Sequence, residues 1–247
     1  MSRTIVIGEA LDALCTWAAV DTVAQAVEAI AARGRFTWVL SGGSTPRPLF
    51  EKIAREAQFR DAVDWGRVHV FWSDERHVAP DHPDSNYGMA RGAMLGALRL
   101  PEANIHRMRG EMADAEAAAQ AYDDELARFF ALPPDQMPAF DLALLGMGAD
   151  GHTASLFPGS PALAETRRRV VATWSESAKA HRITLTFPAL NAATRVVVLV
   201  AGADKAVTVQ RVLEGPPVPD ELPSQRISST GSVVWALDRE AAARLRQ

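Results

Sequence analysis

The sequence lacks the features of several protein classes. A single cysteine, Cys15, among 247 residues excludes an intrachain disulfide and therefore a disulfide-stapled scaffold. No uncharged apolar run approaches the roughly 18–20 residues that span a bilayer. Basic residues are not in excess: the net charge is −4 and the pI about 5.9. Proteins that wrap nucleic acid usually carry a basic excess. An anionic small ligand therefore has to be held by a few locally clustered cations.

What the sequence does contain is ordinary for a globular chain, with 48% hydrophobic and 23% charged residues. That composition excludes a disordered or collagen-like chain. The first residues are not a signal peptide, because Glu9 and Asp12 interrupt the apolar stretch. We therefore expect a cytoplasmic protein, with Cys15 as a buried apolar thiol on a helix.

Short apolar runs alternate with segments of helical period. The runs are nearly continuous in hydrophobicity, which is typical of strands buried on both faces of a parallel sheet. They are 36–40, 68–72, 140–145, 196–201 and 233–237. Helices are predicted from about Trp17 to a cap at Gly34, from Asp114 to just before Pro133, and from Lys205 to Gly215. Alternating strands and helices predict a doubly wound, mostly parallel α/β sheet with helices on both faces. No composition shift marks a boundary, so we expect one domain over residues 1–247.

Four of these runs lead directly into glycine-rich or charged segments. In open α/β sheets, ligands bind where the loops at the carboxyl ends of the strands converge. The segments Ser41–Thr45, Ser73–His77, Gly146–Thr153 and Gly202–Lys205 should therefore line one cleft.

The first segment is typical of an anion-binding turn. Gly42 and Gly43 allow close backbone approach, Ser44 and Thr45 offer hydroxyl donors, and Pro46 suits a first helical turn. Ser41 precedes them at the strand end. The Gly-Lys-Ser/Thr ending of a Walker A loop is absent. Taken alone, the segment is equally compatible with a plain tight turn.

The remaining segments supply charge. Asp74 and Arg76 follow a buried strand, and Arg76 could fork onto a phosphate, although a solvated charge cluster is the alternative. Lys205 stands near a helix start, an electropositive place for a phosphate. Arg182, at the start of another apolar run, is a further candidate cation.

The segment from Gly146 to Thr153 matches Gly-x-Gly-x-x-Gly, but Pro158 and Gly159 cut short the long helix of a dinucleotide site. Its distinctive part is His152 beside Asp150. A histidine presented from a glycine loop can act as a general base, with a structural histidine as the alternative. No Gly-x-Ser-x-Gly elbow is present. No His-x-x-x-His pair or cysteine partner indicates a zinc site.

Together these segments resemble the 6-phosphogluconolactonase family. The resemblance rests on Leu-Ser-Gly-Gly-Ser-Thr-Pro (40–46), Trp-Ser-Asp-Glu-Arg (72–76), Asp-Ser-Asn-Tyr-Gly (84–88), Leu-Leu-Gly-Met-Gly-Ala-Asp-Gly-His-Thr-Ala-Ser-Leu-Phe-Pro-Gly (144–159), His-Arg-Ile-Thr-Leu-Thr (181–186), Gly-Ala-Asp-Lys-Ala (202–206) and Val-Trp-Ala-Leu-Asp (234–238). These stretches stand in the family's order and span nearly the whole chain.

The resemblance implies a fold shared with glucosamine-6-phosphate deaminases and ribose-5-phosphate isomerases. It also implies hydrolysis of 6-phosphogluconolactone in the pentose phosphate pathway, with His152 activating water and no metal or organic cofactor. The expected partner is a phosphorylated sugar lactone, not nucleic acid or a membrane. Ser41–Thr45, Arg76, Arg182 and Lys205 would bind the phosphate, while Asp150 and Asp74 would orient His152 or contact sugar hydroxyls.

Two alternatives remain open. The deaminases share the Gly-Gly loop and Asp-Gly-His, but carry an Asn-Glu-Pro stretch after that histidine. Here the corresponding stretch, 154–158, has no carboxylate. A sugar-phosphate sensor on the same fold is the non-enzymatic alternative. Residues 1–35 supply too little for a helix-turn-helix module.

Overall fold

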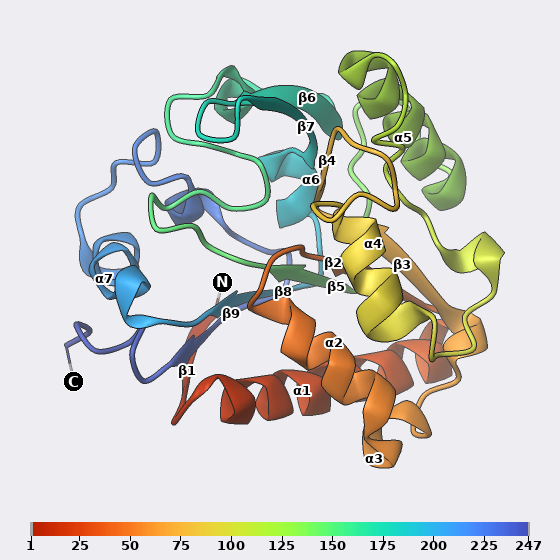
Figure 1. Ribbon diagram of the computed structural model, residues 1–247, viewed down its shortest axis with the longest axis horizontal. Helices are drawn as coiled ribbons and strands as arrows, with labels where there is room; N and C mark the ends of the chain where they lie inside the picture. Colours follow the sequence, from red (N-terminus) through yellow and green to blue (C-terminus); the bar gives the residue numbers. More distant parts are fainter. Residues whose placement is uncertain (1, 247) are drawn as a thin grey trace.

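The protein is built around one six-stranded parallel sheet. A computed structural model describes residues 2–246 (Figure 1), so that residues 1 and 247 of the expected domain lie outside the described residues. The sheet has the order β1-β9-β8-β5-β2-β3, and all neighbouring strands run parallel. Its strands are β1 (Ser2–Gly8), β2 (Phe36–Leu40), β3 (Val68–Trp72), β5 (Leu142–Leu145), β8 (Arg195–Val200) and β9 (Ser232–Asp238). The predicted parallel strands are thus confirmed.

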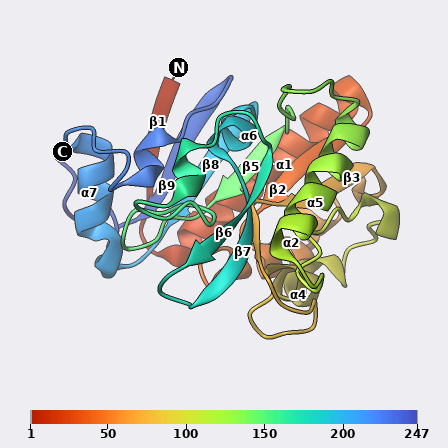
Figure 2. The same ribbon diagram turned by 90° about the horizontal axis from the view of Figure 1, so that it is seen from above.

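Helices cover both faces of this sheet (Figures 1 and 2). They are α1 (Leu11–Arg33), α2 (Pro46–Arg55), α3 (Ala57–Arg60), α4 (Asn86–Ala90), α5 (Ala115–Phe130), α6 (Phe187–Asn191) and α7 (Ala206–Glu214). The apolar side chains of α1, α2 and α4 share one core with one face of the sheet. Those of α5, α6 and α7 share the core on the other face. The doubly wound prediction is therefore correct.

The helix ends follow from local sequence. Gly34 ends α1 in the left-handed region, at a φ of 77°, which glycine adopts without a steric penalty. The Asp114 carboxylate accepts a 2.7 Å hydrogen bond from the Ala117 N–H and so caps α5. Pro46 occupies the first turn of α2, where its missing N–H costs nothing. Cys15 on α1 is fully buried, and burial, followed by the nearby Asp12 charge, raises the pKa of its thiol to about 11.

A second, three-stranded antiparallel sheet was not predicted. It has the order β4-β7-β6 and consists of β4 (Asp74–Arg76), β6 (Val170–Ser175) and β7 (Ala180–Leu185). The segment around Asp74, expected as a charged loop, is thus partly a strand. Its three residues are all charged and show no apolar alternation, so the pattern could not indicate pairing with a strand about a hundred residues away.

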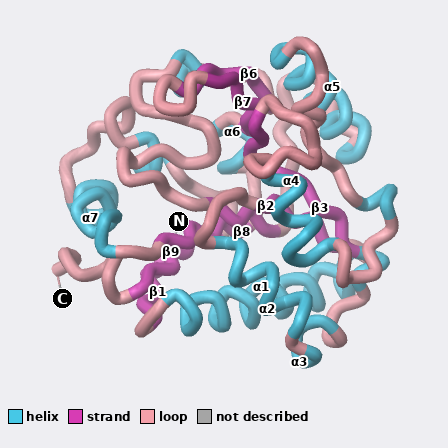
Figure 3. The backbone as a smooth tube through the Cα atoms, in the orientation of Figure 1, coloured by secondary structure: helices cyan, strands magenta, loops and turns pink. Residues whose placement is uncertain are grey.

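The chain reverses direction across the sheet between β2 and β5. From β2 it moves to β3 at one edge, and it later returns to β5 on the other side of β2. Such a reversal opens a crevice between the two loops that follow the strands. Here these are the loops beginning at Ser41 and Gly146. Figure 3 shows the loops gathering above the sheet, on the side of β6, β7 and α7, over the helical layer of α1 and α2. No helix of the described residues has the length and apolar character to cross a membrane.

Candidate active site

A cavity of about 350 Å³ lies at this reversal. Ligand sites of small molecules typically occupy about 300–1,000 Å³. All four predicted segments contribute to the cavity. The predicted site residues that line it are Ser41, Gly42, Gly43, Ser44, Thr45, Asp74, Arg76, His152 and Lys205. Asp150 and Arg182 are absent from its lining, but each neighbours a lining residue: Asp150 is hydrogen-bonded to His152, and Arg182 is the register partner of Arg76.

The loop after β2 leads to an uncapped helix start. Thr45 is the N-cap of α2, yet no side chain caps this helix and no acidic residue occupies its first turn. The first N–H groups of a helix carry a partial positive charge. In the first four residues of α2 these are the N–H groups of Arg47 and Leu49, because Pro46 and Pro48 have none. Gly42 is tightly confined: an added Cβ would lie 1.8 Å from Asn86 Oδ1. The sequence therefore brings the positive end of α2 to the cavity on a backbone that only glycine permits.

His152 is oriented by a carboxylate. Its Nδ1 lies 2.6 Å from Asp150 Oδ1, and its backbone N–H donates to the same oxygen at 3.1 Å. Burial raises the pKa of the Asp150 carboxyl, but the hydrogen bond and charge of His152 outweigh it, so that this pKa lies below its ordinary value. Because an ionised carboxylate only accepts, the neutral ring carries its proton on Nδ1, which leaves the Nε2 lone pair free.

The loop carrying His152 is tied together by hydrogen bonds. The Gly148 N–H donates to the His152 carbonyl at 2.9 Å, and Thr153 Oγ1 donates to the Gly146 carbonyl at 2.9 Å. Thr208 Oγ1 of α7 donates to the Ala149 carbonyl at 2.6 Å. These bonds fix the position of the histidine relative to β5 and α7.

Two arginines lie opposite each other on the small sheet. Arg76 of β4 and Arg182 of β7 are register partners. Arg76 Nη1 donates to the Asp84 carbonyl at 2.5 Å. Burial, followed by the Arg76 charge, lowers the pKa of Arg182 from its usual value. Two adjacent guanidinium groups repel each other, so this corner of the cavity favours an anion.

Lys205 supplies the third cation. It is the N-cap of α7, its side chain is 23% exposed, and Nζ lies 3.1 Å from Asp204 Oδ2. Its approach to the cavity follows from the strand-to-helix junction after β8, as the sequence predicted.

The sequence reasoning missed Asn86 as a lining residue. Its Nδ2 donates to the Asp74 carbonyl at 2.8 Å, and it shapes the floor under Gly42. The segment that contains it, Asp84–Gly88, was noted only as part of the resemblance. An asparagine that follows a turn carries no signal of its own, because it is a common helix-start residue.

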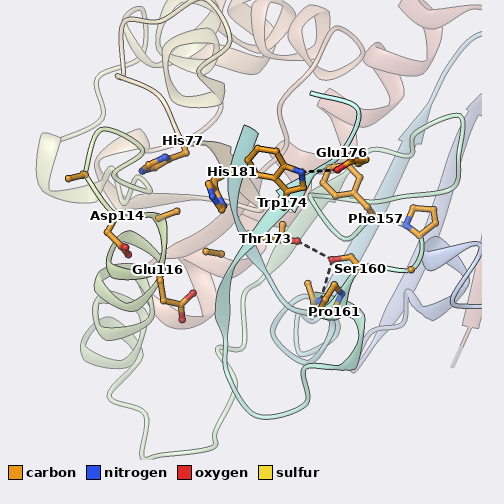
Figure 4. A pocket seen from close by; sticks show the side chains of 16 residues that line it. His77, Asp114, Glu116, Phe157, Ser160, Pro161, Thr173, Trp174, Glu176 and His181 are labelled. Carbon is orange, nitrogen blue, oxygen red and sulfur yellow. Dashed lines mark hydrogen bonds between the residues drawn. The ribbon is translucent and has the colours of Figure 1, made fainter. Parts of the chain in front are cut away.

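His77 does not join the predicted cleft. It lines a second cavity of about 660 Å³ on the outer side of β6 and β7, together with His181 and Trp174 (Figure 4). His77 Nε2 lies 2.7 Å from the Met112 carbonyl oxygen. The side chains of successive strand residues alternate between faces, so His77 and Arg76 point apart. Phe157 also lines the second cavity, and its ring centroid lies 4.8 Å from that of His152.

The described residues contain no group of three or more His, Cys, Asp or Glu side chains arranged to hold a metal ion. The lining of the first cavity offers a histidine, two cations (Arg76 and Lys205) and a helix start.

Comparisons with known proteins identify the family of the chain. A family model described as "Glucosamine-6-phosphate isomerases/6-phosphogluconolactonase" matches residues 9–235. A protein of Synechocystis named 6-phosphogluconolactonase is 46% identical over 93% of this chain and 92% of its own. The structure of 6-phosphogluconolactonase from Trypanosoma cruzi superimposes with a TM-score of 0.88, at 28% identity, covering 100% of this chain and 98% of that chain.

The fold alone is shared more widely. A monomeric glucosamine-6-phosphate deaminase superimposes with a TM-score of 0.81 at 21% identity, covering 97% of this chain and 99% of that chain. The sequence match over nearly the whole chain is the more specific finding. The chain belongs to the family of glucosamine-6-phosphate isomerases and 6-phosphogluconolactonases.

Proposed function

We propose that the protein hydrolyses 6-phospho-D-glucono-1,5-lactone to 6-phospho-D-gluconate, a step of the oxidative pentose phosphate pathway. The observation that carries this proposal is His152, held by Asp150, in one cavity with an uncapped helix start and Lys205. The lactonase names of relatives similar over nearly the full chain support the same reaction.

The substrate phosphate binds at the positive end of the cavity. Backbone N–H groups and hydroxyls of Ser41–Thr45 surround it, and Lys205 approaches from α7. Arg182, the register partner of Arg76 on the small sheet, adds positive charge beside the cavity. Hydrogen bonds to charged groups contribute about 1.5–3 kcal/mol each. Three of them at the upper end of this range give about 9 kcal/mol, which is enough for micromolar binding, about 8 kcal/mol, by a chain of net charge −4.

His152 is the general base. Its Nε2 takes a proton from a water molecule, which attacks the lactone carbonyl carbon. Proton transfer by a positioned side chain typically contributes about 10²–10⁴-fold to the rate. When the ring C–O bond breaks, the same nitrogen returns the proton to the leaving ring oxygen. Asp150 stabilises the charged imidazolium between these two steps.

The oxyanion that forms on the carbonyl oxygen needs a donor. The N–H groups of Gly148 and Gly151 already donate within the loop, to the carbonyls of His152 and Gly148. Arg76 keeps free N–H groups beside its bond to Asp84, because a guanidinium offers five. We therefore favour Arg76 as the oxyanion donor over the glycine loop.

A deaminase is the runner-up. Ring opening, isomerisation and deamination need more acid and base groups than lactone hydrolysis. The stretch after His152, residues 154–158, offers no carboxylate. The similarity to a deaminase structure at 21% identity concerns the fold and does not favour that reaction.

The proposal includes a small-molecule partner and a location. The ligand is a phosphorylated sugar lactone, with neither nucleic acid nor a membrane as partner, in keeping with the acidic balance. The cytoplasm, where sugar phosphates are processed, is the proposed location. Hydrolysis by a histidine base requires no cofactor.

The test is a lactonase assay on freshly prepared 6-phosphogluconolactone, corrected for spontaneous hydrolysis. We expect acid release well above the uncatalysed rate and no ammonia from glucosamine 6-phosphate. Ammonia release without lactone hydrolysis would establish the deaminase alternative. Neither activity, together with sugar-phosphate binding, would indicate a sensor.

A further inference from the structure

Two neighbouring buried carboxylates, Asp74 and Glu75, differ in how many hydrogen bonds the protein gives them. A carboxylate offers about four acceptor positions. Both oxygens of Glu75 accept two bonds each, at 2.7–3.1 Å. The donors are the N–H groups of Arg76, Asn86 and Tyr87 and the hydroxyl of Ser85. Glu75 is thus fully occupied by the protein itself.

Asp74 is one bond short of that number. Its Oδ1 accepts from Ser73 Oγ at 3.2 Å and from Asn86 Nδ2 at 3.3 Å. Its Oδ2 accepts from Ser155 Oγ at 2.7 Å. Within residues 2–246 no other side chain donates to this carboxylate. Asp74 also lines the first cavity, whereas Glu75 does not. One acceptor position of Asp74, on Oδ2, is therefore left for a ligand.

The donor to that oxygen comes from a distant part of the chain. Ser155 lies 81 residues from Asp74 in the sequence and three residues after His152. Its side chain is buried, with the residue 2% exposed, and its backbone N–H donates to Thr184 Oγ1 of β7 at 3.2 Å. Because β7 pairs with β4, Ser155 is anchored to the same small sheet as Asp74. It links the histidine loop to the carboxylate.

We propose that Ser155 is a positioning residue that aims the free lone pair of Asp74 Oδ2 at a hydroxyl of the phosphorylated sugar, in the lactone and in the open-chain 6-phosphogluconate alike. This inference rests on the proposed function. Two residues then orient the substrate. Asp74 contacts a hydroxyl, and His152, held by Asp150, faces the carbonyl carbon. Ser155 sets their relative position, since it is hydrogen-bonded to Asp74 and follows His152 by three residues on the same loop.

The experiment compares Ser155→Ala with Ser224→Ala. Ser224 is a matched control, because its Oγ is also buried but has no hydrogen-bond partner in the described part of the chain. Binding of 6-phosphogluconate, of its deoxy analogues and of inorganic phosphate is measured by calorimetry, and lactone hydrolysis by kcat and KM.

For Ser155→Ala we expect affinity for 6-phosphogluconate to fall roughly tenfold, the size of one charge-assisted hydrogen bond. Inorganic phosphate should bind as in the wild type. The deoxy analogue that lacks the contacted hydroxyl should bind both proteins equally. Asp74→Asn retains the shape of the side chain. It should likewise lose the preference for 6-phosphogluconate over the deoxy analogue that lacks the contacted hydroxyl.

Equal weakening for 6-phosphogluconate and every deoxy analogue would overturn the inference, because the effect would then be a general loss of structure. Behaviour of Ser155→Ala identical to that of Ser224→Ala would overturn it as well. Failure of the wild type to bind 6-phosphogluconate or to hydrolyse the lactone is a separate result. It would overturn the proposed function and the inference with it.

Discussion

At the scale of single residues, His152 is tightly confined. Asp150 bonds its Nδ1, and Phe157 packs near its ring. Gly148 lies directly beneath, where an added Cβ would come within 2.2 Å of His152 Nδ1. Glycine is therefore required at position 148 because any side chain there would displace the His152 ring.

This confinement predicts the effect of Gly148→Ala. The new methyl group displaces the imidazole from Asp150, and a misplacement of about 1 Å can cost about 10²-fold in rate. We expect kcat to fall by about that factor while the protein stays folded. The measurement is kcat together with a circular dichroism melting curve. Gly92→Ala is the control, since nothing lies within 4 Å of a Cβ there, and it should retain full activity. Full activity of Gly148→Ala would show that the ring position does not matter.

At the scale of elements, the site is assembled from strand ends and helix starts. The uncapped start of α2 and the N-cap position of Lys205 on α7 place positive charge at the same cavity. Long-range attraction between helix ends and a phosphate is modest, so we assign most of the binding free energy to direct hydrogen bonds.

We predict that Lys205→Ala raises KM and the dissociation constant of 6-phosphogluconate by roughly 10–100-fold, with a smaller change in kcat. Lys179→Ala is the matched control, because Lys179 also pairs with a neighbouring carboxylate, that of Glu176, but lies at the exposed β6–β7 turn. Steady-state kinetics on both variants gives the comparison. An unchanged KM in Lys205→Ala would remove this lysine from the phosphate site.

The sequence was sufficient for the elements that follow periodic patterns. The run 36–40 coincides with β2, and the cap at Gly34 ends α1 where predicted. The small sheet escaped prediction because β4 is entirely charged: Glu75 is buried only because backbone N–H groups surround it. That compensation depends on tertiary structure. Burial raises the pKa of Glu75, and these N–H groups counteract the rise only in part.

The same limit applied to the site. Segments that directly follow strands could be placed together by topology, which put His152, Lys205 and Asp74 at one cavity. Asn86 and Ser155 carry no such signal, because their contribution depends on distant partners. The roles of these residues and the extent of the domain stay predictions.

At the scale of the whole molecule, the half-buried His69 and the buried His106 beside it make stability depend on pH. His69 Nδ1 lies 3.2 Å from His106 Nε2, and His106 Nδ1 lies 2.8 Å from Glu125 Oε1. Burial, followed by the charges of His106 and Arg35, lowers the pKa of His69 from 6.5 to about 4. Between pH 4 and pH 6.5, His69 binds a proton in the unfolded chain but not in the folded chain. Stability is therefore complete above pH 6.5 and falls as the pH drops towards 4.

We predict that lowering the pH from 7 to 5 reduces the free energy of unfolding by about 1–2 kcal/mol through His69, whose half-buried ring is partly screened by solvent, and lowers Tm by about 2–8 °C. His69→Gln cannot titrate at this position. Its Tm at pH 7 should be lower than that of the wild type, but its Tm should decrease less between pH 7 and pH 5. Thermal melts of both proteins at each pH make the comparison. An equal decrease in the two proteins would show that His69 is not the group responsible.

The central claim is that His152 activates the water that opens the lactone, and it is tested most directly in His152→Ala. One preparation of this variant is used for two measurements: lactone hydrolysis, corrected for the spontaneous rate, and the dissociation constant of 6-phosphogluconate. We predict that kcat falls about 10²–10⁴-fold while the dissociation constant changes little, because the phosphate contacts are untouched. Wild-type kcat in His152→Ala would contradict the account.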